Sequence, residues 1–215
     1  MKVFLFFSSV SPVLPIIWGI VVFRHLDYLS KTFLGYLVIA ITVGIGVMVL
    51  GMNHIHNLWL AQFFIPIQYC FLVWIFSIRL SKESVRQLFR WSIPFFVVAW
   101  VIIVSFFEDV NSFSIISSPL AYVLLIMVAS YSLFDTNKDN SSPILKIPTF
   151  WISSGSLIYF SGTLALIILS NQFLKSSSES LKTAWMFQTT ANIMSYLVFI
   201  GAFSCQYRPR NSGGS

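Results

Sequence analysis

Charged residues are scarce in this chain. Only 9% of its 215 residues are Asp, Glu, Lys or Arg, whereas a soluble domain carries roughly 25%. Hydrophobic residues make up 57% of the chain and the mean hydropathy is +0.82. So few charges cannot cover a soluble surface of this size, and we predict that most of the surface faces lipid. The formal charge of +6 lies in the gaps between apolar runs, so we do not expect a nucleic-acid partner.

Cysteine and histidine are also rare. The two cysteines, Cys70 and Cys205, lie in or beside apolar runs without metal or redox spacing, so no disulfide framework is predicted. His54 and His56 form a weak candidate for a metal site, because a catalytic zinc needs roughly three protein ligands. We interpret the pair as hydrated loop residues and predict no metal.

Chemically active motifs are missing too. No Asp, Glu, Lys, Arg or His lies in the core of any predicted span, which removes the usual general acids and bases and argues against a proton pump. Gly155-Ser156 and Ser161-Gly162 do not form Gly-x-Ser-x-Gly, and the chain has no phosphate-binding glycine loop. We therefore predict that the chain is not an enzyme and carries no cofactor.

Long apolar runs dominate what is present. A helix needs about 20 largely apolar residues to cross a bilayer, and it must be a helix because lipid cannot satisfy free backbone groups. The sequence predicts seven such spans, over residues 3–23, 32–52, 58–78, 91–107, 115–134, 150–170 and 184–204. We predict an all-α, polytopic membrane protein with one domain over residues 1–210. Residues 211–215 resemble an appended linker.

The distribution of Lys and Arg predicts the orientation. Ten of the thirteen lie after spans one, three and five or in the C-terminal tail. By the positive-inside rule the N-terminus is outside and the C-terminus is cytoplasmic, in a multi-pass protein of the cytoplasmic membrane. A positive stripe after span three could meet a cytoplasmic signalling partner or anionic lipid, or could be ordinary positive-inside bias. The stripe comprises Arg79, Lys82, Arg86 and Arg90.

Three short matches recur in the same order in the two halves of the chain and predict an internal repeat. They pair Ser11-Pro12 with Ser118-Pro119, Leu50–Asn53 with Leu169–Asn171, and Trp59–Gln62 with Trp185–Gln188. This three-plus-one-plus-three pattern resembles the superfamily of sugar-efflux proteins, lysosomal amino-acid exporters and microbial rhodopsins. The resemblance implies a substrate site between the halves. Span seven contains no lysine, so it cannot carry retinal as rhodopsins do.

A second resemblance is more local. Phe150–Gly162, followed by Asn171, looks like the sixth span of a group of short bacterial seven-span proteins. Asn57–Tyr69 looks like their third span. Some members resemble companions of sensory signalling systems, so the resemblance implies membrane sensing.

Neutral polar residues in the spans are the candidates for ligand contact. At helical spacing, Gln62 and Tyr69 share one face of span three, and Gln188 and Asn192 share one face of span seven. The candidate ligand-binding residues are Gln62, Gln68, Tyr69, Tyr122, Gln188 and Asn192. They either line an outward-opening polar cavity or only join helices, at about 0.6 kcal/mol per hydrogen bond. Gly155 and Gly162, with Ser156 and Thr163, are predicted close-packing positions rather than ligand contacts.

Three functions fit these features. The first is a receptor-like, sensory protein that binds a small neutral or apolar ligand from outside and signals to a cytoplasmic partner. The second is a facilitative transporter of a small polar solute, and the third is a structural membrane subunit. Neither the ligand nor the oligomeric state follows from the sequence.

Overall fold

The protein is helical throughout the part that the structure describes. A computed structural model describes residues 11–109, 114–136, 143–173 and 178–207, and contains no strand in these ranges. The helices are α2 (Val13–Val21), α3 (Tyr28–Met52), α4 (Leu58–Ser77), α5 (Glu83–Phe106), α6 (Ser117–Thr136), α7 (Pro148–Phe173) and α8 (Ser178–Ser204), with single 3-10 turns η1 (Phe23–His25) and η2 (Ile144–Lys146). The start of the predicted first span and the predicted linker lie outside the described residues.

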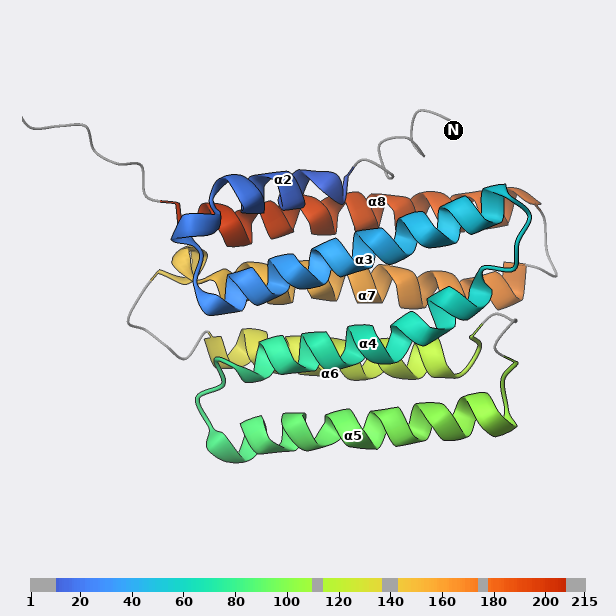
Figure 1. The fold of residues 1–215 in the computed structure, drawn as a ribbon, viewed down its shortest axis with the longest axis horizontal. Coiled ribbons are helices and arrows are strands. Elements are labelled where there is room, and N and C mark those ends of the chain that lie inside the picture. The colour runs from blue at the N-terminus through green and yellow to red at the C-terminus, as the bar shows by residue number, and fades with distance from the viewer. Residues whose placement is uncertain (1–10, 110–113, 137–142, 174–177, 208–215) are drawn as a thin grey trace, which may run out of the picture.

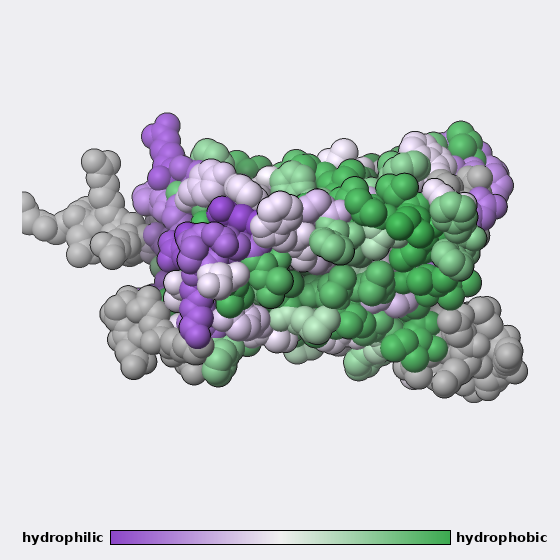
Figure 2. Space-filling model, turned by 90° about the horizontal axis from the view of Figure 1, so that it is seen from below, coloured by the Kyte–Doolittle hydropathy of each residue, from purple (hydrophilic) through white to green (hydrophobic). Residues whose placement is uncertain are grey.

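Six helices, α3 to α8, are long and apolar enough to cross a membrane, as expected for a multi-pass membrane protein. The all-α prediction is confirmed, while the seventh span, the orientation and the repeat stay predictions. Large apolar side chains cover the outside of the bundle, among them Phe95 and Phe106 of α5, which are 79% and 78% exposed. Figure 2 shows this hydrophobic surface over the middle of one face, with hydrophilic residues gathered toward the ends.

The helices form two layers (Figure 1). The first layer holds α2, α3 and α4, and the second holds α8, α7 and α6, so that α3 lies over α7. Helix α5 lies at the edge, in contact with α4 and α6. The most extensive helix contact joins α7 to α8, followed by that of α6 with α7. We call the end where α3 begins and α8 ends the Asp27 end, and the opposite end the Glu108 end.

The turn after α3 gives His54 a structural role. The backbone N–H of His54 donates to the Gly51 carbonyl at 3.1 Å, and that of Ile55 donates to the Leu50 carbonyl at 3.0 Å. This pair of bonds is a Schellman motif, which requires a left-handed residue just after the helix. His54 occupies that position with φ of 57°. It therefore ends a helix, and its side chain is exposed.

Glycine allows the closest helix approaches. A Cβ added at Gly162 would lie 2.5 Å from the Cβ of Ala191, and one at Gly155 would lie 2.4 Å from the ring of Phe199. Both contacts join α7 to α8. The close-packing prediction is confirmed for these two glycines, whereas Ser156 and Thr163, which it also included, line the cavity described below.

Candidate functional site

A cavity of about 910 Å³ lies between the two layers. Five of the six long apolar helices line it, namely α3, α4, α6, α7 and α8. It extends from the middle of the bundle toward the Glu108 end, where Val47 of α3, Leu58 of α4 and Ile167 of α7 line it. Most of the lining is apolar, as is usual for a small-molecule site.

Four tyrosines from four different helices line this cavity. They are Tyr36 of α3, Tyr122 of α6, Tyr159 of α7 and Tyr196 of α8, and we call them the tyrosine cluster. The rings of Tyr159 and Tyr196 are 6.4 Å apart between centroids. The ring of Phe160 lies 5.4 Å from that of Tyr122 and 5.1 Å from that of Tyr159, and the ring of Phe199 lies 6.0 Å from that of Tyr196, so these rings share one region of the cavity.

The hydroxyl groups of the tyrosine cluster differ in their partners. Gln68 of α4 donates from Nε2 to the hydroxyl of Tyr36 at 2.8 Å. No hydrogen bond between described residues uses the hydroxyls of Tyr122, Tyr159 or Tyr196. These three side chains are only partly buried, because they open onto the cavity. Their hydroxyls are therefore available to hydrogen-bond to a molecule bound there.

Three of the six predicted ligand-binding residues line the cavity, namely Gln68, Tyr122 and Gln188. The hydroxyl of Tyr69 is instead 3.0 Å from that of Ser92, and its ring stacks on that of Phe96. Asn192 is not a lining residue, although its Oδ1 is buried without a partner in the described chain. Ligand binding by any of the six stays a prediction.

Gln62 belongs to a different network, around Glu108. Its Nε2 donates to Glu108 Oε2 at 2.9 Å and to Ser117 Oγ at 3.2 Å. The same carboxylate accepts from Ser117 Oγ and from the backbone N–H groups of Ile116 and Ser117. Glu108 therefore caps the start of α6 and ties it to α4. Burial alone would raise the pKa of Glu108, but these hydrogen bonds outweigh it and lower the pKa below its ordinary value.

Replacing Gln62 with leucine should lower the free energy of unfolding by about 1–3 kcal/mol, because Glu108 then loses a buried donor. Glu108→Gln should lower the free energy of unfolding by a similar amount, because the side-chain NH2 group of the new glutamine would face backbone N–H donors. The double variant should cost less than the sum, because both residues belong to one network. Thermal unfolding in detergent checks this, and strict additivity would contradict it. Gln87→Leu, an exposed position on α5, is the control.

The histidine pair lies away from the cavity. His54 and His56 are both exposed in the connection between α3 and α4. The described part of the chain contains no group of three His, Cys, Asp or Glu residues that could hold a metal ion.

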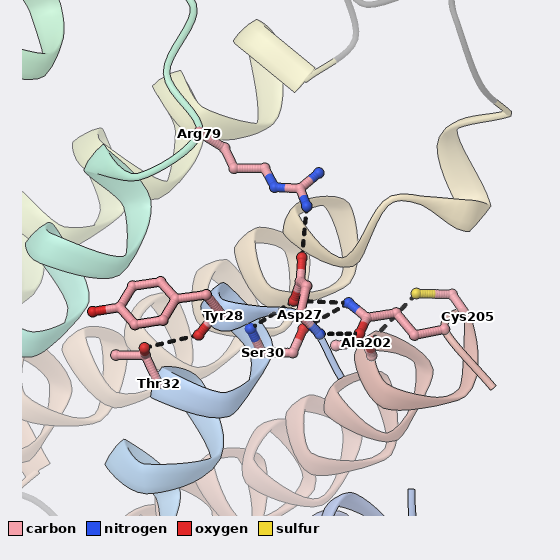
Figure 3. Close-up of polar contacts among 8 residues, drawn as sticks. Asp27, Tyr28, Ser30, Thr32, Arg79, Ala202 and Cys205 are labelled. Carbon is pink, nitrogen blue, oxygen red and sulfur yellow. Dashed lines mark hydrogen bonds and ion pairs between the residues drawn. The ribbon is translucent and has the colours of Figure 1, made fainter. Parts of the chain in front are cut away.

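A second polar network lies at the Asp27 end (Figure 3). Asp27 caps α3 by accepting the backbone N–H of Ser30 at 2.9 Å. Its carboxylate also accepts from Gln206 Nε2 at 3.0 Å and from Arg79 Nη2 at 2.6 Å. The backbone N–H of Asp27 in turn donates to Gln206 Oε1 at 2.8 Å. We call Asp27, Arg79 and Gln206 the Asp27 clamp, because it joins the start of α3 to the α4–α5 connection and to the end of α8.

The contacts at the Asp27 end shift the pKa of Asp27 and that of the neighbouring Cys205. Burial opposes the ionised form of Asp27, but the hydrogen bonds from Gln206 and Ser30 and the charge of Arg79 outweigh it, so its pKa falls below 3.8. Burial and the nearby Asp27 carboxylate raise the pKa of Cys205 to about 11. Cys205 is therefore a protonated thiol at neutral pH and a poor nucleophile.

Three of the four residues of the predicted basic stripe have partners within the chain. Arg79 pairs with Asp27, and Arg86 pairs with Glu83 one turn earlier on α5. Arg90 lies over the ring of Trp74, 5.0 Å from its centroid. An acidic cytoplasmic partner would therefore compete with contacts that already exist.

The comparisons with known proteins give no family. No family model, curated protein or solved structure matches this chain. Its function has to be inferred from the cavity and from the two polar networks.

Proposed function

We propose that this chain is a receptor-like membrane protein that binds a small, mostly apolar molecule between its two helix layers. The observation that carries the proposal is the 910 Å³ cavity with three unused tyrosine hydroxyls. Packed aromatic rings border the cavity toward the Asp27 end. The rings of Phe33 and Phe199 are 4.9 Å apart between centroids, and Phe33 and Phe203 are fully buried. Packed side chains on that side favour a binding site over a channel through the bundle.

The Asp27 clamp offers a route from the cavity to the cytoplasm. Helices α3 and α8 both line the cavity, and their far ends meet in the clamp. A ligand that binds one spacing of these two helices more tightly shifts the population toward that spacing. The shift would change the hydrogen bonds of the Asp27 clamp. The predicted cytoplasmic partner would bind beside the clamp, at Arg79, Lys82, Arg86 and Arg90.

A facilitative transporter is the second candidate. One observation favours it: the order α2, α3, α4 faces the order α8, α7, α6 (Figure 1). A twofold rotation about an axis between α3 and α7 would exchange α2 with α6 and α4 with α8, which are the pairs of the predicted repeat. Transporters built from parallel repeats bind their substrates between the halves.

Filling the cavity should change the Asp27 end if the two are coupled. Ser156 of α7 lines the cavity, and Ser161 of the same helix is exposed. We expect Ser156→Phe to alter amide hydrogen exchange in residues 23–30 and 203–207 by about tenfold, as a coupling of about 1.4 kcal/mol would do. The protein is measured in lipid nanodiscs, and Ser161→Phe is the matched control.

The same variants separate the two candidates. Unchanged exchange at the Asp27 end in Ser156→Phe would contradict the receptor-like proposal. Uptake of radiolabelled glucose, glycine and urea into proteoliposomes is measured in parallel. Saturable uptake that Ser156→Phe blocks and Ser161→Phe does not would establish the transporter instead.

A further inference from the structure

The geometry points to a class of ligand: a neutral, lipophilic molecule with an oxygen acceptor, held by hydroxyl groups of the tyrosine cluster. This inference rests on the proposed function, because it concerns the same cavity. It adds the chemical class of the ligand and the hydroxyl groups that would bind it. Three features of the cavity lining carry it, namely its donors, its lack of charge and its apolar walls.

The donors come first. Tyr36 accepts a hydrogen bond from Gln68 Nε2, so its own hydroxyl proton is left to donate elsewhere. The hydroxyls of Tyr122, Tyr159 and Tyr196 bond to no described residue, so each also has its proton to donate. Four phenol donors on four helices in one cavity are best satisfied by a ligand that accepts hydrogen bonds, such as a ketone, a quinone or an ester.

The absence of charge excludes an ionic ligand. None of the described residues that line the cavity is Asp, Glu, Lys, Arg or His. The carboxylate of Glu108 lies outside the lining and is already satisfied by Gln62, Ser117 and backbone donors. An ion in this cavity would lose its hydration without gaining a counter-charge, at a cost of several kcal/mol. Amino acids, phosphates and amines are therefore poor ligands.

The walls favour a lipophilic body. Apolar side chains from four helices line the cavity, including Ile41, Phe64, Leu72, Leu166 and Phe199. At its edge the lining includes residues exposed on the surface of α3 and α4, namely Gly44, Met48 and Ala61. These lie within helices that are apolar enough to be in the membrane, so an apolar ligand can enter from lipid. The volume is at the upper end of the range of about 300–1,000 Å³ for small-molecule pockets.

Four probes of one skeleton test the class. They are 2-acetylnaphthalene, a neutral ketone; 2-ethylnaphthalene, its hydrocarbon counterpart; 2-naphthoate, an anion; and 2-naphthylmethylamine, a cation. Binding to the full chain in lipid nanodiscs is measured by equilibrium dialysis, with empty nanodiscs as the baseline. We expect saturable binding of the ketone, with an affinity about five- to tenfold above that of the hydrocarbon, as one or two net hydrogen bonds would give. The two ions should bind more weakly still.

Variants then assign the binding to the tyrosine cluster. The double variant Tyr159→Phe/Tyr196→Phe removes two of the four donors, so it should lower the affinity for the ketone toward that for the hydrocarbon and leave the affinity for the hydrocarbon unchanged. Tyr131→Phe is the matched control, because Tyr131 of α6 is partly buried against the ring of Phe89 and lies outside the cavity lining. An equal loss of ketone affinity in Tyr131→Phe would contradict the assignment.

The remaining outcomes separate this inference from the proposed function. Tighter binding of the naphthoate or the amine, lost on filling the cavity with Ser156→Phe, would overturn the neutral class and support the cavity as a binding site. Equal binding of ketone and hydrocarbon, unaffected by the double variant, would overturn the role of the tyrosines alone. No binding of any probe above empty nanodiscs would contradict both the ligand class and the receptor-like function.

Discussion

Gly162→Val is expected to lower the free energy of unfolding by about 3 kcal/mol, which is at the upper end for overpacking a core. The added side chain would start 2.5 Å from the Cβ of Ala191. Neither Cβ can rotate away from the other, so the backbones of α7 and α8 must separate. This is the most extensive helix contact in the bundle, and small residues at such contacts let membrane helices pack closely.

Thermal unfolding of the purified protein in detergent measures the effect. Gly35→Ala is the control, because a Cβ at Gly35 would meet nothing within 4 Å. We expect this control to be neutral or slightly stabilising, since alanine favours a helix more than glycine does. Gly155→Ala should be intermediate, because the neighbouring ring of Phe199 can move. Unfolding of Gly162→Val at the wild-type temperature would contradict the packing argument.

Much of the fold could be predicted from the sequence, because apolar runs of span length force helices in lipid. Six of the predicted spans coincide with helices that the structure describes. The boundaries differ most at α5, which was predicted from residue 91 and begins at Glu83. Hydropathy ends a span at its first charges, here Arg90 and Arg86, whereas helical hydrogen bonding continues through them.

The candidate site could be predicted only in part. Helical spacing correctly groups Gln62 with Tyr69 on one face of α4, but it does not say which face meets the cavity. The rotation of α4 turns that face toward Glu108, Ser117 and Ser92, while Gln68 meets the cavity. The spacing of residues within one helix does not show which neighbouring helices a given face contacts.

Three members of the tyrosine cluster were not predicted, although the sequence held a signal. Tyr159 and Tyr196 lie well inside their predicted spans, away from the ends where interfacial tyrosines gather, whereas Tyr36 is the fifth residue of its span. A hydroxyl at that depth needs a partner inside the protein or a cavity. Tyrosine within a span is therefore a better indicator of this cavity than the Trp-x-x-Gln repeat.

Asp27→Ala is expected to lower the free energy of unfolding by about 2 kcal/mol. It removes the N-cap of α3, which is typically worth about 1 kcal/mol, and the acceptor for Gln206 and Arg79. Asp27→Asn should cost about half as much, because asparagine is also a good N-cap and keeps one side-chain oxygen. Thermal unfolding in detergent at neutral pH ranks the two variants. Equal stability of Asp27→Ala and wild type would contradict the role of the clamp.

The pH dependence has a definite sign. The pKa of Asp27 is lower in the folded protein than its ordinary value of 3.8, so the ionised carboxylate stabilises the fold. That stabilisation is fully present above about pH 5 and is lost as the pH falls through the folded pKa, below 3.8. The gap in stability between wild type and Asp27→Asn should therefore narrow as the pH falls from about pH 6 to values below 3.8. Glu108 titrates in the same direction, but it does so in both proteins and cancels in the comparison.

The two side chains that bind Asp27, those of Gln206 and Arg79, should contribute unequally to the free energy of unfolding. The side chain of Arg79 is 49% exposed, and an exposed ion pair is worth about 0–1 kcal/mol. Gln206 exchanges two hydrogen bonds with Asp27 and a third with Ser30 Oγ, all in a partly buried position. A double-mutant cycle of Asp27→Ala with Gln206→Ala should thus give a larger coupling than one with Arg79→Ala. The reverse order would mean that charge, rather than the joining of α3 to α8, holds the Asp27 end together, and the route from the cavity would then have to pass through α4.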